Sequence, residues 1–381
     1  MNKVGDYLIK VMLTNACNLN CKYCYEKNKA NKSMKLKTAI ETIDFYFDKY
    51  NKFDSISSLR FHGGEPLLQF DILKEMVYYF EKKSNALNKD SKFELTTNGT
   101  LINEEIANFI NEHDFKVTVS LDGNKSEHDK NRVFLNGEGS YAETIIGLKT
   151  LRNIVGPNKI FLRLTITPDT VDSLYENIRF LMNLGYKKFR LSLDFYSNWI
   201  GEEFKIEKQF TKLKNLYIEN RGSIYLDIFD GNYTNYILEN QNIVYCNAGL
   251  GSVIVDTDGI LYPCAYSMDE EFQIGNIWTG VKFEKFSEII KKYFNKNNQI
   301  YKKCKECEVK RFCMGLKCSF VNLSINGKLN VPPYGMCVQE KILYYLMKDI
   351  ISTLILNNDY EFKKLVDIIK SKKELSIIEG L

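Results

Sequence analysis

Three cysteines close to the N-terminus constrain this chain more than any other feature of its sequence. Cys17, Cys21 and Cys24 lie in the run Cys-Asn-Leu-Asn-Cys-Lys-Tyr-Cys. Three thiolates in one loop can hold three irons of a cubane iron–sulfur cluster, whereas most cluster proteins supply four cysteines and transfer electrons. A missing ligand leaves an open coordination position, which is typical of a catalytic metal site. Zinc binding or plain reduced thiols are the alternatives, but no fourth cysteine or histidine lies nearby to complete a zinc site.

The composition indicates a cytoplasmic protein. The chain has 381 residues, 44% of them hydrophobic, which is enough for one large domain and a smaller one. The net charge of +4 is small, and no basic run is dense enough to predict nucleic-acid binding. No signal peptide is evident, and Lys348 and Asp349 interrupt the apolar stretch Ile342–Leu356, so we expect no membrane segment. In the cytoplasm, ten cysteines are better explained as metal ligands than as disulfides.

Short β-forming runs alternate with amphipathic helical patterns over the first half of the chain, which predicts an α/β fold with a parallel sheet. Right-handed crossovers would curl six βα units into a partial (β/α)6, TIM-like barrel. The predicted strands are Tyr7–Leu13, Ser58–His62, Lys92–Thr97, Phe115–Leu121, Ile160–Thr167 and Lys188–Phe195, and the predicted helices include Thr38–Tyr50, Ile72–Lys82, Tyr141–Ile154 and Ser173–Leu184.

The second half of the chain has a different pattern. We expect the barrel to occupy residues 1–235, a small cysteine-rich domain residues 236–340, and C-terminal helices residues 341–381. Val253–Tyr262 reads as a strand, an Asp-Gly turn and a second strand.

Polar and glycine-rich motifs follow the first four predicted strands. The cysteine loop comes after the first, His62–Pro66 after the second, Thr97–Thr100 after the third and Ser120–Gly123 at the end of the fourth. In parallel barrels the active site forms at the C-terminal ends of the strands. The motifs therefore predict one shared pocket.

The cysteine spacing, with Tyr23 at the aromatic position, resembles the radical S-adenosylmethionine (SAM) superfamily. Gly63, Gly64 and Glu65 match the GGEP motif of that family. The resemblance implies that SAM chelates the open iron, and that an electron from the cluster cleaves SAM to a 5′-deoxyadenosyl radical. It also implies that Glu65 and the backbone at Gly64 hold the amino end of SAM. An ordinary turn with a surface glutamate is the alternative for this motif.

Further SAM contacts are implied by the same resemblance. Ser120 would meet the ribose or methionyl part of SAM, Arg132 its carboxylate and Leu193 its adenine. Strand-end packing, a solvated loop arginine and a core leucine are the respective alternatives. Among the three histidines, His62 adjoins the pocket, whereas the polar surroundings of His113 and His128 predict surface positions.

The C-terminal cysteines resemble the SPASM extension of radical SAM enzymes, although the last internal spacing is one residue longer than usual. The resemblance implies two auxiliary [4Fe–4S] clusters, and hence three in total, together with a flavodoxin- or ferredoxin-type reductant. The set with one ligand too few would be Cys246, Cys264 and Cys318. The complete set would be Cys304, Cys307, Cys313 and Cys337. Zinc bound at the C-x2-C pair is the alternative.

The resemblance leaves several activities open. We expect side-chain modification of a peptide or protein, such as thioether or other crosslink formation. The alternatives are formylglycine formation in sulfatases, small-molecule dehydrogenation and a non-catalytic electron carrier. Sulfatase maturases usually carry an aspartate base after the Tyr-Pro-Cys cysteine, whereas here Cys264 is followed by Ala265. Peptide maturases often begin with a leader-binding domain, which we do not find before the first predicted strand.

Overall fold

The computed structural model of the protein describes residues 8–26, 31–50, 56–238, 248–315 and 318–378. The chain divides into two compact units. One unit consists of residues 4–163 and 246–294, and the other of residues 1–3, 164–245 and 295–381. Residues 246–294 therefore group with the N-terminal part of the chain.

The first unit is built on a sheet in the order β11-β10-β9-β8-β1-β2-β3-β4-β5. Five parallel strands lie along it, each separated from the next by helices, and the parallel strand β8 lies on the far side of β1. The parallel strands are β1 (Leu8–Met12), β2 (Ile56–His62), β3 (Asp90–Thr97), β4 (Lys116–Ser120), β5 (Ile160–Ile166) and β8 (Ser252–Val255). Antiparallel strands extend the edge beyond β8: β9 (Ile260–Tyr262), β10 (Gly275–Asn276) and β11 (Gly280–Val281).

Alternation along the strands separates an apolar face from a polar face. Ile9 and Val11 of β1 are fully buried, whereas Lys10 between them is partly exposed. Phe93 and Phe115 stack with their ring centres 5.1 Å apart, and each buried ring contributes about 1.5–3 kcal/mol.

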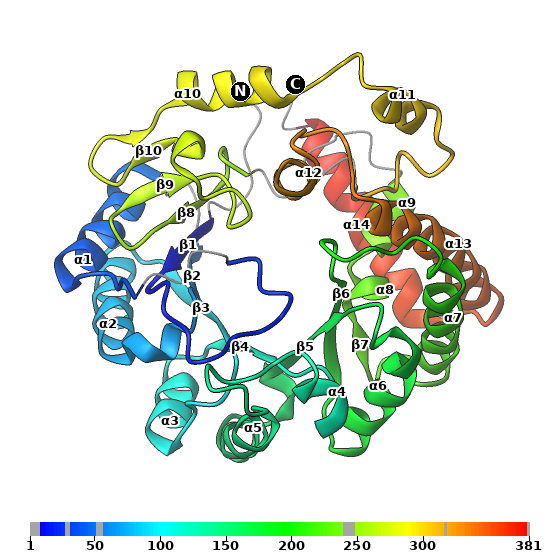
Figure 1. The fold of residues 1–381 in the computed structure, drawn as a ribbon, viewed down its shortest axis with the longest axis horizontal. Coiled ribbons are helices and arrows are strands. Elements are labelled where there is room, and N and C mark those ends of the chain that lie inside the picture. The colour runs from blue at the N-terminus through cyan, green and yellow to red at the C-terminus, as the bar shows by residue number, and fades with distance from the viewer. Residues whose placement is uncertain (1–7, 27–30, 51–55, 239–247, 316–317, 379–381) are drawn as a thin grey trace. The chain divides into compact units, whose positions relative to one another are not determined.

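The helices of this unit are α1 (Leu36–Phe45) with a π turn (Tyr46–Tyr50), α2 (Phe70–Ala86), α3 (Glu104–Glu112), α4 (Lys125–Asp129), α5 (Tyr141–Val155) and α10 (Phe283–Tyr293); 3-10 turns cover Pro66–Gln69, Pro157–Lys159 and Glu270–Phe272 (Figure 1).

The second unit is mainly helical, with the parallel pair β6 (Lys188–Leu193) and β7 (Tyr225–Leu226). Trp199 is 1% exposed and packs against the backbone of Gly335, where an added Cβ would lie 2.4 Å from the indole ring. The helices are α6 (Leu174–Asn183), α7 (Glu203–Glu219), α8 (Asp227–Asp230), α9 (Tyr233–Leu238), α11 (Gln299–Glu306), α12 (Ser319–Asn326), α13 (Tyr334–Leu356) and α14 (Tyr360–Ile378), with a 3-10 turn at Val171–Ser173.

The predicted α/β class with a parallel sheet and C-terminal helices is confirmed. All six predicted barrel strands correspond to strands β1 to β6, and the Asp-Gly hairpin corresponds to β8 and β9. The expected domain boundaries stay predictions. Among the described residues, no helix combines the length and apolarity needed to cross a membrane.

Candidate active site

The three N-terminal cysteines lie in the loop between β1 and α1. Cys17, Cys21 and Cys24 are half-buried and form no disulfide bond. The backbone N–H of Leu19 donates to the Cys17 Sγ at 3.4 Å, an arrangement that suits a thiolate ligand. Three thiols outside disulfides, one of them with an N–H donor to sulfur, fit a cluster with one open iron, and this assignment stays a prediction. No three or more His, Cys, Asp or Glu side chains among the described residues gather around one point as ligands of a single ion.

Gly63 and Gly64 fit the loop after β2 tightly against the start of the cysteine loop. The N–H of Gly64 donates to the Thr14 carbonyl, and that of Glu65 to the Ala16 carbonyl, both at 2.8 Å. A Cβ on Gly64 would lie 2.1 Å from the Ala16 oxygen, closer than any real contact. The glycines are therefore needed for backbone packing immediately before Cys17.

The buried side chain of Glu65 connects the loop after β2 to the loop after β3. Its carboxylate is 1% exposed and accepts hydrogen bonds from Leu67 N (3.1 Å), Thr97 Oγ1 (2.7 Å) and Asn98 N (2.7 Å). Burial raises the pKa of Glu65 to about 7, although the three hydrogen bonds favour the charged form. The predicted role of Glu65 at the SAM amino group stays a prediction. The contacts show that it also orients the loop after β3.

The loop Thr97–Thr100 reaches from Glu65 to the cysteine loop. Asn98 donates from Nδ2 to Asn18 Oδ1 at 2.8 Å, and the same nitrogen lies 4.0 Å from Cys17 Sγ. Asn18 in turn donates to Thr100 Oγ1 at 2.8 Å. Sequence reasoning placed this motif at the pocket but assigned it no function.

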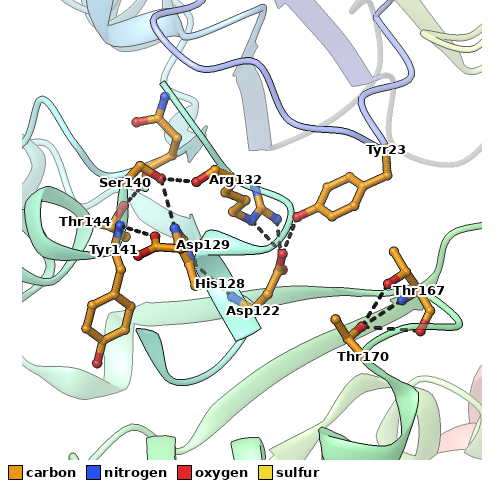
Figure 2. Close-up of polar contacts among 11 residues, drawn as sticks. Tyr23, Asp122, His128, Asp129, Arg132, Ser140, Tyr141, Thr144, Thr167 and Thr170 are labelled. Atoms are coloured by element: carbon orange, nitrogen blue, oxygen red, sulfur yellow. Dashed lines mark hydrogen bonds and ion pairs between the residues drawn. The ribbon is translucent and has the colours of Figure 1, made fainter. Parts of the chain in front are cut away.

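Arg132 is held by Asp122, which sequence reasoning did not single out. Its Nε and Nη2 donate to the two Asp122 oxygens at 3.0 and 3.1 Å, and both side chains are buried (Figure 2). The Tyr23 hydroxyl donates to the same carboxylate, and the guanidinium carbon lies 5.2 Å from the centre of the Tyr23 ring. Burial disfavours the guanidinium charge, yet the Asp122 carboxylate keeps the pKa of Arg132 above its usual value. These contacts link the end of β4 to Tyr23, the aromatic residue of the cysteine motif.

The expected surface positions of two histidines are wrong. His128 is fully buried, and its polar atoms find partners inside the protein. Its Nε2 pairs with Ser140 Oγ at 3.0 Å, while Ser140 donates to the Arg132 carbonyl (Figure 2). Burial lowers the pKa of His128 to about 4. The His113 side chain is 6% exposed, with Nδ1 2.8 Å from Glu81 Oε1.

His62 lies in a cationic part of the first unit. Its Nδ1 is 3.4 Å from the Tyr25 hydroxyl, and the Tyr25 ring is 4.7 Å from that of Tyr266. Burial lowers the pKa of His62 to about 3, assisted by the positive charges of Lys10, Arg163 and Arg60 in that order. A neutral imidazole beside the cysteine loop is the expected state at neutral pH.

The remaining predicted SAM contacts lie at strand ends. Ser120 ends β4, is 9% exposed and pairs in register with Arg163 of β5. Leu193 ends β6 in the second unit and is 2% exposed. Both stay predictions as SAM contacts.

The C-terminal cysteines divide between the two units. Cys264 follows β9 in the first unit, and Cys246 lies outside the described residues. The other five belong to the second unit: Cys304, Cys307, Cys313, Cys318 and Cys337.

The charges of two of these thiols act on the titration of a third. Burial and then the charges of Cys304 and Cys307 raise the pKa of Cys337 to about 11, although Lys341 opposes the shift. Glu340 is a residue that sequence reasoning missed: its carboxylate is 1% exposed and accepts from Met314 N at 2.7 Å, next to Cys313. The ligand roles of the predicted distal set stay predictions.

Two family models match the chain. Residues 11–181 match the radical SAM superfamily, and residues 246–308 match an iron–sulfur cluster-binding domain known as SPASM. The first match contains the cysteine loop, the glycine motif and Arg132. The second contains Cys246, Cys264, Cys304 and Cys307.

Curated relatives extend this similarity over most of the chain. A cysteine-type anaerobic sulfatase-maturating enzyme of Clostridium novyi is 31% identical over 80% of this chain and 86% of that protein. The radical SAM cyclopropyl synthase TigE of Paramaledivibacter caminithermalis is 25% identical over 88% of this chain and 72% of that protein. An uncharacterized Methanocaldococcus jannaschii protein is 37% identical over 48% of this chain, and the chain spans 60% of its length.

A solved structure has the same fold. Native anSMEcpe with bound AdoMet and Kp18Cys peptide superposes with a TM-score of 0.76 at 22% identity, covering 92% of this chain and 99% of that one.

Proposed function

The chain belongs to the radical SAM superfamily and carries a SPASM domain, and we propose that it modifies a side chain of a peptide or protein. The observation that carries this proposal is the match to a sulfatase-maturating enzyme over 80% of this chain and 86% of that protein. The anSMEcpe structure with a bound peptide, which has the same fold, supports a peptide substrate. When bound, a reduced cluster and SAM supply an adenosyl radical that abstracts a hydrogen atom.

The residues around the cysteine loop would orient these groups. Cys17, Cys21 and Cys24 would ligate three irons, and Glu65 would fix the loops on either side. The buried pair of Arg132 and Asp122 would hold Tyr23 of the cysteine loop in place. Preorganised contacts of this kind limit the reorganisation needed during a reaction.

Two further clusters would be held by the seven C-terminal cysteines. The set Cys246, Cys264 and Cys318 is one thiolate short, so a substrate cysteine is the natural fourth ligand. Coordination to iron would favour loss of the proton from the substrate thiol and would hold its sulfur in place. Flavodoxin or ferredoxin would supply the electrons in the cytoplasm.

Formylglycine formation is the second candidate, favoured by the similarity to the Clostridium novyi enzyme. Ala265 weighs against it, because alanine cannot accept the proton that the usual aspartate base would take. Tyr25 and His62, joined by a contact of 3.4 Å beside the cysteine loop, are a described pair that could take part in proton transfer instead. Small-molecule dehydrogenation and simple electron carriage are the remaining alternatives.

The test is anaerobic turnover with SAM, dithionite and cysteine-containing peptides encoded by neighbouring reading frames, deuterated at the cysteine Cβ. Mass spectrometry should find 5′-deoxyadenosine and a peptide that has lost a pair of hydrogen atoms. An aldehyde on the former cysteine would establish formylglycine formation instead. Deuterium in 5′-deoxyadenosine would show abstraction from Cβ. If 5′-deoxyadenosine forms but every peptide stays unchanged, the proposed peptide substrate is wrong. If no 5′-deoxyadenosine forms, the proposed cleavage of SAM is wrong.

A further inference from the structure

We propose that Asn98 is a positioning residue for the N-terminal cluster, because its side-chain amide donates a hydrogen bond to the Cys17 thiolate and so raises the cluster's reduction potential. The inference rests on the proposed function in one respect: Cys17 must be a cluster ligand. It assigns a role to the Thr97–Thr100 motif, for which the activity alone gives no explanation.

The orientation of the Asn98 amide is fixed by Thr100. Asn98 Oδ1 accepts from the Thr100 backbone N–H at 2.9 Å and from the Thr100 hydroxyl at 2.7 Å. A backbone N–H can only donate, so a flipped amide would place two donors face to face. Nδ2 must therefore point away from Thr100, towards the cysteine loop.

A closed ring of hydrogen bonds then uses one of the two amide protons. Asn98 Nδ2 donates to Asn18 Oδ1 at 2.8 Å, and Asn18 Nδ2 donates to Thr100 Oγ1 at 2.8 Å. The second Nδ2 proton has Cys17 Sγ as its described acceptor, at 4.0 Å. That distance is long for a neutral thiol, and the negative charge of an iron-bound thiolate would strengthen the contact.

The backbone of Asn98 is held independently of its side chain. Its N–H donates to Glu65 Oε2 at 2.7 Å, and its carbonyl accepts from Thr144 Oγ1 at 3.2 Å. The residue is only 7% exposed. The amide thus faces Cys17 before any cluster binds, and little conformational entropy remains to be lost.

The expected effect is on the cluster's electronics. Hydrogen bonds to the sulfurs help to set the potential of an iron–sulfur cluster, because they stabilise the more negative, reduced state. Cys17 would have two N–H donors, from Leu19 at 3.4 Å and from Asn98. Loss of the Asn98 donor should make the cluster harder to reduce.

The experiment is an EPR-monitored redox titration of the anaerobic holoenzyme, following the signal that changes when SAM is added. Asn98→Ala should move its midpoint to a more negative potential, with the Kd for SAM changed less than twofold. Thr144→Val is the matched control, since it removes a hydrogen bond to the Asn98 backbone but leaves the amide in place, and its midpoint should equal the wild-type value. If Asn98→Ala loses iron, Asn98→Ser takes its place.

An unchanged midpoint in both Asn98 variants would overturn the inference, as would an equal shift in Thr144→Val. The failure of the proposed function gives a different result, since the wild-type protein would then show no SAM-sensitive signal at all.

Discussion

Asp122 and Arg132 form a buried pair in which both carboxylate oxygens meet two guanidinium nitrogens, at 3.0 and 3.1 Å. Arg132 was expected to bind the SAM carboxylate. Because Nε and Nη2 already serve Asp122, a ligand carboxylate would meet only the remaining edge of the guanidinium. Arg132 therefore has a structural role as the buried ion-pair partner of Asp122, in addition to any role in binding SAM.

Replacing Asp122 by Asn should destabilise the protein, because Arg132 would keep its charge in a buried place without a carboxylate partner. The expected loss is roughly 3 kcal/mol of unfolding free energy. Anaerobic denaturant titration measures it. The control is Asp114→Asn, which removes the exposed pair between Lys159 and Asp114, and a change below about 1 kcal/mol is expected there. Equal effects of the two variants would contradict the assignment.

Stability should fall as the pH drops from about 6.5 to about 4, partly because of His128. Its folded pKa of about 4 lies below the ordinary value of 6.5, so the unfolded chain binds the extra proton in this interval. The contribution is at most about 3 kcal/mol. Unfolding free energies of the wild type and His128→Asn, measured across this range, should show a smaller slope in the variant. His62 will keep part of the slope, and parallel curves would argue against the buried neutral state of His128.

Gly64→Ala should prevent the loop after β2 from packing beside the cysteine loop, since the new Cβ would lie 2.1 Å from the Ala16 oxygen. We expect a lower iron content and a weaker SAM-sensitive EPR signal. Gly137→Ala is the control: Gly137, unlike Gly64, has a positive φ, of +89°, but no atom lies within 4 Å of its added Cβ. That change should cost about 1 kcal/mol of backbone strain and leave the iron content unaltered.

Anaerobically reconstituted protein should bind about twelve irons per chain, the sum of three four-iron clusters. Replacing Cys17, Cys21 and Cys24 together by Ala should leave about eight irons and abolish 5′-deoxyadenosine formation. Iron analysis and chromatography of the reaction products measure both. About four irons in the wild type, with zinc present, would show that the C-terminal cysteines hold no clusters.

The sequence was sufficient to predict the strands and the order of the motifs, because both are local. β-forming runs between amphipathic helices have a clear period, and the motifs at Cys17, Gly63 and Asn98 directly follow strands. The C-terminal ends of parallel strands share one edge, so the neighbourhood of these loops could be predicted without knowing any side-chain contact.

The particular partners could not be predicted, because they depend on distant segments. Asn98 bonds to Asn18, eighty positions earlier, and no local signal selects that residue. His128 has charged neighbours in the sequence, yet Ser140 covers it from the next loop. Local polarity was therefore a misleading guide to burial.

Strand β1 has consequences for how the protein is made. It is hydrogen-bonded to β2 on one side and to β8 on the other, and β8 begins only at Ser252. During translation the second edge of β1 must wait, unpaired, until most of the chain has left the ribosome. The cysteine loop begins where β1 ends, so its final anchoring comes late in synthesis.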